Sequence, residues 1–229
     1  DYTKAKTGAT TNTLTASDTN WSISATNLDT ALAADVLFAG ALTVTGITAE
    51  TSALTDYTKA KTGADTNTLV ASDTNWSVNS STLNTAINNT NKIRLAGDIT
   101  VTGIDSVYET STLTAYTSTN TGADTITLSA TDNNWSIPTS TLTTVLGDGV
   151  RLAGDLTVTG IANGNEAAAL TDYTTAKTGA TKNTLNATDT NWSVAAADLT
   201  AALGAGVILV GDLTVTNIAT ETNASTTYS

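Results

Sequence analysis

The sequence contains no cysteine, methionine or histidine, and it has one proline and one phenylalanine. Without cysteine and histidine the chain cannot form disulfides, Cys/His zinc sites, thiol nucleophiles or an imidazole general base. Aromatic residues make up 5% and charged residues 13% of the 229 positions, which departs from the composition of ordinary globular domains. Most familiar catalytic chemistry is therefore excluded, and we expect that the protein is not an enzyme.

Basic residues are also scarce, because 9 lysines and arginines stand against 21 aspartates and glutamates, for a net charge of −12. Nucleic acids and anionic membranes attract basic patches that release counterions, so we expect no nucleic-acid partner. The sequence has no 18-residue apolar run, which predicts no membrane insertion. It opens at Asp1 without a signal-peptide pattern, which we interpret as typical of a mature product or an excised piece.

Threonine is abundant, at roughly a quarter of the chain, and it belongs to an internal repeat. Five tyrosines are spaced by 55, 59, 57 and 55 residues, and a tryptophan follows each of the first four by 19 residues. The tyrosines are Tyr2, Tyr57, Tyr116, Tyr173 and Tyr228. This spacing predicts four repeats, 1–55, 56–114, 115–171 and 172–229, stacked in one continuous rod.

Differences in repeat length occur at only two points. One lies between Ala86 and Gly97, where "NNTNK" lengthens the second repeat, and the other follows the "VTGI" motif. Insertions accumulate in loops, whereas elements that stack on their equivalents keep their length. We therefore predict loops at both points.

Two helices are predicted in each repeat. In residues 50–63, Glu50 falls in the first turn, Leu54 and Tyr57 share a face, and Gly63 suits the C-cap. In residues 195–206, apolar side chains recur at helical spacing before a glycine. The copies of this second helix begin at Asn27, Thr82 and Ser140.

Strands are predicted between these helices. "ALTVTGI" (41–47) and its copies alternate apolar residues with threonine, and "NTLTAS" and "WSIS" are shorter runs of the same kind. Each repeat of about 57 residues then holds two strand–helix coils. The predicted fold class is an α/β repeat solenoid with a stacked parallel sheet. Its predicted core comprises Leu28, Leu32, Leu42, Val44, Leu54, Tyr57 and their copies. The alternatives are a right-handed parallel β-helix and separate small domains.

The motif "SDTNWSIS" (17–24) returns with small changes in every repeat. Aromatic faces beside carboxylates and amides suit carbohydrate, but Asp and Asn also bond their own backbone two residues on and so turn the chain. We interpret the motif as a structural corner with the tryptophan packed beneath it. The predicted corner residues are Asp18, Asn20, Trp21, Asp73, Asn75, Trp76, Asp132, Asn134, Trp135, Asp189, Asn191 and Trp192.

Calcium is the one cofactor that the sequence suggests. Asp98, Asp155 and Asp212 follow a glycine in three repeats, whereas the first repeat has Ala41 there. Calcium sites need several converging oxygens, and an aspartate after glycine is commonly a turn residue. We therefore expect no cofactor, with these three aspartates as the weak metal candidates.

The chain opens with "DYT" and closes with "TYS", at the same phase of the repeat. We interpret this as a unit that continues into another copy, either covalently within a very large protein or by head-to-tail docking into a filament, since heterologous contacts of this kind propagate.

The alternation of "LTVTGI" with "SDTNWSI" and "DLTAAL" resembles the Thr/Ala-rich repeat arrays of large bacterial surface and secreted proteins, such as adhesins, S-layer-like proteins and extracellular matrix fibres. The resemblance implies an extracellular, cell-surface structural protein that forms a rod, a head-to-tail filament or a surface layer. The alternative that it implies is a carbohydrate- or calcium-dependent adhesin segment with cell-surface glycans as partners.

Overall fold

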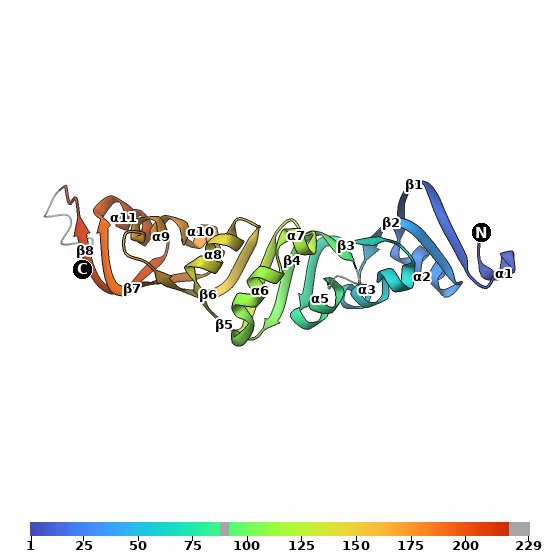
Figure 1. Cartoon of the computed structure of the whole chain (residues 1–229), viewed down its shortest axis with the longest axis horizontal. Coiled ribbons are helices and arrows are strands. Elements are labelled where there is room, and N and C mark those ends of the chain that lie inside the picture. Colours follow the sequence, from blue (N-terminus) through green and yellow to red (C-terminus); the bar gives the residue numbers. More distant parts are fainter. Residues whose placement is uncertain (88–91, 220–229) are drawn as a thin grey trace. The chain divides into compact units, whose positions relative to one another are not determined.

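The computed structural model describes residues 1–87 and 92–219 of the chain. The chain divides into two compact units: unit 1 holds Asp1–Ile104 and Ala115–Thr127, and unit 2 holds Asp105–Thr114 and the residues from Leu128 onward. Strands and helices alternate along the chain in both units (Figure 1).

The first half of the chain carries strands β1 to β4 with short helices between them. In chain order the elements are α1 (Lys4–Thr7), β1 (Asn12–Ser24), α2 (Ala25–Ala33), β2 (Val36–Ile47), α3 (Glu50–Asp56), α4 (Lys59–Thr62), β3 (Thr66–Asn79), α5 (Ser80–Ile87) and β4 (Ile93–Ile104).

The second half repeats this alternation. The elements are the 3₁₀ helix η1 (Ser106–Tyr108), α6 (Glu109–Ala115), α7 (Ser118–Thr121), β5 (Ile126–Pro138), α8 (Thr139–Leu146), β6 (Val150–Ile161), α9 (Glu166–Asp172), α10 (Thr175–Thr178), β7 (Lys182–Ala195), α11 (Ala196–Gly204) and β8 (Val207–Thr216).

The strands pair in parallel and in the order of the sequence. In unit 1, β1 pairs with β2, β2 with β3 and β3 with β4. In unit 2, β6 pairs with β7 and β7 with β8. Parallel neighbours need a crossover connection, and the helices between the strands supply it. The prediction of an α/β fold with a parallel sheet is confirmed, and the all-β alternative is wrong.

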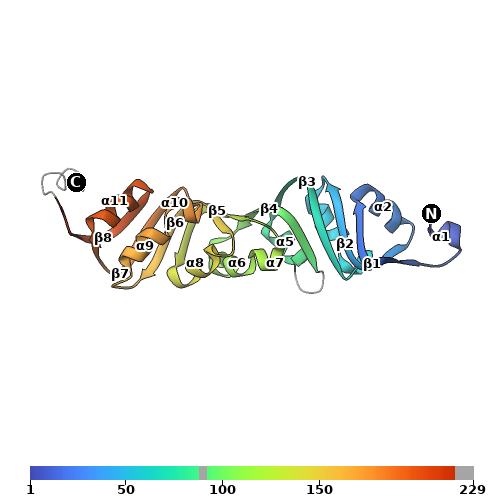
Figure 2. The same cartoon turned by 90° about the horizontal axis from the view of Figure 1, so that it is seen from above.

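The core lies between the strands and the helices that cover them. Alternate residues of each strand point inward, so that Leu42 and Val44 of β2 are buried while the neighbouring Thr43 and Thr45 are half-buried. In unit 2, α9 packs on β7 and α11 on β8 (Figure 2). Each longer helix contributes one fully buried leucine to this core, as the alternation of apolar and polar positions predicts. These residues are Leu28, Leu54, Leu83, Leu113, Leu142, Leu170 and Leu199.

The runs "NTLTAS" and "WSIS" both lie in strand β1, as one strand per coil requires. Two details of the predicted elements are wrong. The helix expected over 50–63 is two helices, because α3 ends at Asp56 and α4 begins at Lys59. Leu32, placed in the predicted core, is only half-buried. Of the predicted "NNTNK" loop, residues 88–91 lie outside the described residues.

Within the described ranges, no helix is long and apolar enough to cross a membrane.

Candidate functional site

The four repeated motifs lie inside strands β1, β3, β5 and β7. We call the sequences Ser/Thr-Asp-Thr/Asn-Asn at 17–20, 72–75, 131–134 and 188–191 the arcs. In β1, Thr15 pairs with Ala39 and Asn20 with Ala41, so residues 16–19, which include the first three residues of the arc, stand opposite Gly40 alone. An arc therefore interrupts one strand as an enlarged bulge and does not join two elements, unlike the corner that the sequence suggested.

Each arc is closed by its own aspartate. The backbone N–H of Asn20 donates to Asp18 Oδ1 at 3.1 Å, and the same bond is 3.1 Å long in the other three arcs. The residue between the two has a left-handed backbone, with φ from 59° to 66°. An Asx turn holds this conformation. The bond from the Asn191 N–H also holds the pKa of Asp189 below its usual range.

A glycine of the next strand lies directly beneath each arc. A Cβ atom at Gly97 would lie 2.1 Å from the carbonyl oxygen of Thr74, and at Gly154 it would lie 2.3 Å from that of Asn133. Real Cβ atoms do not approach backbone oxygen so closely, so only glycine fits. The arc and the glycine therefore interlock two neighbouring strands. The sequence alone marks Gly97 and Gly154 only as neighbours of the calcium candidates Asp98 and Asp155.

Each motif tryptophan points inward and fastens the arc to the next strand. The indole Nε1 of Trp76 donates to the carbonyl of Ala96 at 3.1 Å, and that of Trp135 donates to Ala153 at 2.9 Å. The corresponding bonds are 3.0 Å from Trp21 and 2.9 Å from Trp192. Trp76, Trp135 and Trp192 are each 1% exposed. Trp21, in the edge strand β1, is half-buried and meets Phe38 edge-on with ring centroids 5.0 Å apart.

A glutamate from the preceding helix supports the strand just after the arc. Glu50 Oε2 accepts a hydrogen bond from the Ser77 N–H at 2.6 Å, and Glu109 Oε2 accepts from the Ser136 N–H at 2.8 Å. Glu166 breaks the pattern, because it accepts from the Gly164 N–H at 2.6 Å. The sequence alone predicts only a helix start at Glu50. Each of these glutamates stands seven residues before a tyrosine. This constant spacing is the signal in the sequence that indicates a structural role for the glutamate.

Glu109 is 5% exposed, and this burial raises the pKa of its carboxyl group, with the nearby Asp132 adding to the rise and the Ser136 hydrogen bond opposing it. An acid whose pKa is raised by folding binds protons more readily in the folded state. Its contribution to the free energy of unfolding therefore increases as the pH falls from neutral toward the ordinary glutamate pKa of about 4.3.

We expect Glu109→Gln to keep the acceptor for Ser136 and to remove this pH dependence. Urea unfolding would measure the free energy of unfolding of the natural protein and of Glu109→Gln. As the pH is lowered from 7 to about 5, the value of the natural protein should rise relative to that of the variant. Glu109→Ala should destabilise by about 1 kcal/mol at either pH, because the Ser136 N–H loses this part-buried hydrogen bond. A difference between natural protein and Glu109→Gln that stays constant with pH would contradict this role.

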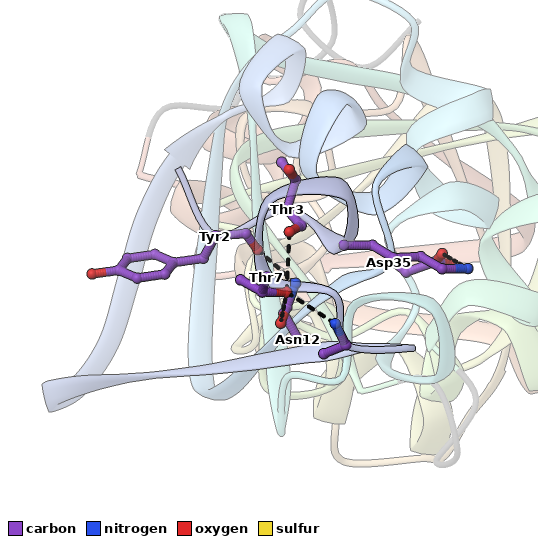
Figure 3. Close-up of polar contacts among 7 residues, drawn as sticks. Tyr2, Thr3, Thr7, Asn12 and Asp35 are labelled. Atoms are coloured by element: carbon purple, nitrogen blue, oxygen red, sulfur yellow. Dashed lines mark hydrogen bonds and ion pairs between the residues drawn. The ribbon is translucent and has the colours of Figure 1, made fainter.

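Two buried asparagines carry amide groups without a partner among the described residues. Asn67 and Asn183 are fully buried, and the Nδ2 atom of each makes no hydrogen bond. Their Oδ1 atoms accept from Thr62 at 3.1 Å and Thr178 at 3.0 Å. In the edge strand the equivalent Asn12 is better placed, because its Nδ2 donates to the carbonyl of Tyr2 at 2.8 Å (Figure 3).

Position 126, equivalent to Asn67 by the repeat spacing, holds a fully buried isoleucine. We expect Asn67→Ile to stabilise unit 1 by about 1 kcal/mol, because it removes an unpaired buried amide. Thr62 keeps its bond to the carbonyl of Thr58 at 3.2 Å. The control Asn12→Ile should destabilise, since that amide is paired. Urea midpoints of the two variants would test this, and a loss of stability for Asn67→Ile would contradict it.

The calcium candidates do not come together. Asp98 and Asp212 lie exposed in β4 and β8, and Asp155 in β6 forms an ion pair with Lys182 at 3.1 Å. All three lie within strands, so the expected turn at these aspartates is wrong. Within residues 1–87 and 92–219, no group of three or more Asp, Glu, His or Cys side chains could hold a metal ion.

A comparison of the chain with protein-family models, curated proteins and solved structures found no match.

Proposed function

We propose that the protein is an extracellular structural repeat protein of a bacterium, which forms a rod, a head-to-tail filament or a surface layer. The observation that carries this proposal is that the repeated motif closes a bulge within one strand and fastens it to the next strand. In each arc the aspartate closes the turn, the tryptophan bonds to the next strand and a glycine receives the arc. A motif engaged in this way supports a mechanical role.

The finer architecture that we propose is a solenoid of four repeats, 1–55, 56–114, 115–171 and 172–229, each with two strand–helix coils. The tyrosines support this division, because each reaches back to the start of an earlier helix. Tyr57 Oη lies 3.4 Å from the carbonyl oxygen of Ala25, Tyr116 Oη 2.9 Å from that of Ser80 and Tyr173 Oη 3.4 Å from that of Thr139. Burial of these rings raises the pKa of Tyr116 to about 12. Contacts between neighbouring coils are what stabilise a repeat array.

Self-association as the mode of action is supported by apolar residues on the edge strand β8. Leu213 is 41% exposed, whereas Leu42 and Leu156 at equivalent positions of inner strands are 1% exposed. Exposed strand edges are templates for pairing with another chain. The extracellular location rests on the resemblance to surface and secreted repeat arrays.

The second candidate function is an adhesin segment that binds glycans or calcium. It is favoured by the exposure of the aspartate and asparagine of all four arcs. Stacking of a sugar on an aromatic face would require the tryptophan to be accessible, and three of the four are buried. This burial makes the structural role the better supported of the two.

Sedimentation velocity and electron microscopy of the protein over a range of concentrations would test the proposal. We expect assemblies that grow with concentration, and that grow further with added salt because each copy carries a net charge of −12. Isothermal titration with calcium chloride and with soluble glycans tests the second candidate in parallel. A protein that remains monomeric at all concentrations and salt levels, while binding calcium or a glycan, would overturn the structural proposal.

A further inference from the structure

The outer edge of β8 exposes an apolar side chain that is buried at the equivalent positions of the inner strands. Leu213 is 41% exposed, whereas Leu42 and Leu156 are 1% exposed. The inner strand β6 has Leu156 at the position of Leu213, where it is covered by the next strand, β7. The β8 edge is thus shaped like the interior of the sheet and has no following strand among the described residues.

The outer edge of β1 also leaves aromatic side chains uncovered that are buried in the other repeats. Tyr2 is 65% exposed, whereas Tyr57, Tyr116 and Tyr173 are between 1% and 5% exposed because they pack on a preceding helix. Figure 3 shows the Tyr2 ring pointing away from the labelled cluster of Thr3, Thr7 and Asn12. Trp21 is likewise only half-buried. Among the described residues, no strand pairs with the outer edge of β1.

We propose that the occupant of the β8 edge is the β1 edge of a second copy of this chain, added in parallel. The proposed register places Leu213 beside Asn12, Thr214 beside Thr13 and Val215 beside Leu14 of the second copy. This inference rests on the proposed head-to-tail function and deepens it by naming the two surfaces that meet and the residues that face each other.

The register follows from two interfaces inside the chain. In β2–β3, Leu42 pairs with Asn67 and Val44 with Leu69. In β6–β7, Leu156 pairs with Asn183 and Val158 with Leu185. β8 carries the same residue sequence as β6 at these positions, Leu-Thr-Val-Thr, and β1 carries the same Asn-Thr-Leu as β3 and β7. The β2–β3 and β6–β7 interfaces therefore use the same register. The outer edge of β8 repeats the first strand of these interfaces, and the outer edge of β1 repeats the second.

Contacts beyond the backbone favour parallel addition of a second copy over pairing of two like edges. At the internal joints, Ser72 donates to the carbonyl of Ile47 at 3.1 Å and Thr188 donates to that of Ile161 at 2.9 Å. The equivalent pair at the proposed joint is Ser17 with Ile218 of the other copy. Only the parallel register brings these two together.

The helices of the two copies would meet through Tyr2. The hydroxyl oxygen Oη of Tyr173 lies 2.6 Å from Thr143 Oγ1 of α8, and either hydroxyl can donate the hydrogen bond. Thr200 of α11 occupies the position equivalent to Thr143 by the spacing from the tryptophan. Tyr2 of the second copy would then lie on α11 at Thr200, and its ring would become buried like the other three.

The absence of cysteine allows the register to be tested by disulfide trapping. Facing residues of parallel strands lie about 4.8 Å apart, within the Cα separation of about 4.4–6.8 Å that a disulfide spans. The double variant Thr13→Cys/Thr214→Cys should form a ladder of disulfide-linked oligomers on mild oxidation. Both threonines are exposed in the free chain, so the substitutions do not disturb its core.

The matched control moves one cysteine by two residues on the same face. In Thr15→Cys/Thr214→Cys the two Cα atoms would lie about 8 Å apart in the proposed register, beyond the reach of a disulfide. This variant should give at most one tenth of the oligomer formed by the first. Equal ladders from both variants, or dimers from the single variants Thr13→Cys and Thr214→Cys alone, would overturn the register.

Two further variants test the surfaces without cross-linking. Leu213→Glu should abolish association at concentrations where the natural protein assembles, and Tyr2→Ala should raise the dissociation constant at least tenfold. The control Tyr108→Ala removes a tyrosine that is 62% exposed in η1, which is part of neither edge strand, and should leave the constant unchanged.

Circular dichroism would confirm that every variant is folded. If the natural protein assembles but Leu213→Glu and Tyr2→Ala assemble equally well, this inference fails while the filament function stands. If the natural protein does not assemble at all, the proposed function fails with it.

Discussion

Replacement of Gly154 by alanine should lower the free energy of unfolding by about 3 kcal/mol. A Cβ atom there would lie 2.3 Å from the carbonyl oxygen of Asn133 and 2.9 Å from its carbonyl carbon, so the backbone of the arc must move. Gly154 also has φ of +101°, which an L-residue adopts at a cost of about 1–2 kcal/mol. Overpacking against the backbone adds about 1–3 kcal/mol.

Gly160 in the same strand provides the matched control. Its φ is +73°, but a Cβ atom would meet nothing within 4 Å. Gly160→Ala should therefore cost only the conformational part, about 1 kcal/mol. Urea unfolding followed by far-UV circular dichroism would measure both variants against the natural protein. Equal losses of stability would mean that the glycine is needed for its backbone conformation and not to receive the arc.

Replacement of Trp135 by alanine should have an effect of similar or greater size, about 4 kcal/mol. Removal of a fully buried tryptophan costs about 3–5 kcal/mol through lost burial and the cavity that remains. The carbonyl of Ala153 would also lose its hydrogen bond from the indole Nε1, at 2.9 Å in the natural protein. The far-UV signal would again report unfolding, because tryptophan fluorescence itself changes with this variant.

Trp21 is the control for this second prediction, because it makes the same indole-to-carbonyl bond, to Ala39 at 3.0 Å, in the edge strand β1. It is half-buried, so Trp21→Ala should cost about half as much. Trp135→Phe keeps most of the apolar surface and loses the hydrogen bond. Its loss of stability should fall between those of Trp21→Ala and Trp135→Ala. If Trp21→Ala and Trp135→Ala destabilised equally, burial of the ring would not be the main contribution.

Much of the local structure could be predicted because each element carries its own period. The alternation of "ALTVTGI" is visible in seven residues and indicates a strand with one buried face, as β2 has. The segment 195–206 contains helix α11 for the same reason. The split of the predicted helix 50–63 could not be foreseen, because Tyr57 falls on the helical face and only its packing on Ala25 and Asp29 shows why α3 ends there.

In the arcs, too, one part of the structure follows from the local sequence and another part depends on the neighbouring strand. An aspartate two residues before an asparagine predicts an Asx turn from local chemistry, and the Asp73 bond to the Asn75 N–H is such a turn. The position of this turn within a strand depends on Ala96 and Gly97 of the neighbouring strand. These residues are more than 20 positions away, and no local pattern connects them to the arc.

The sequence by itself determined the alternation of strands and helices and the chemistry that is missing, because both depend on which residues are present and how closely they are spaced. Only the tertiary structure decided that the Trp135 indole bonds to Ala153 of the neighbouring strand, that Glu109 supports Ser136 and that Gly154 lies beneath an arc. Each of these depends on which strand lies beside which and in what register. Pairing between distant segments is set by the packing of the whole sheet, which a local pattern does not contain.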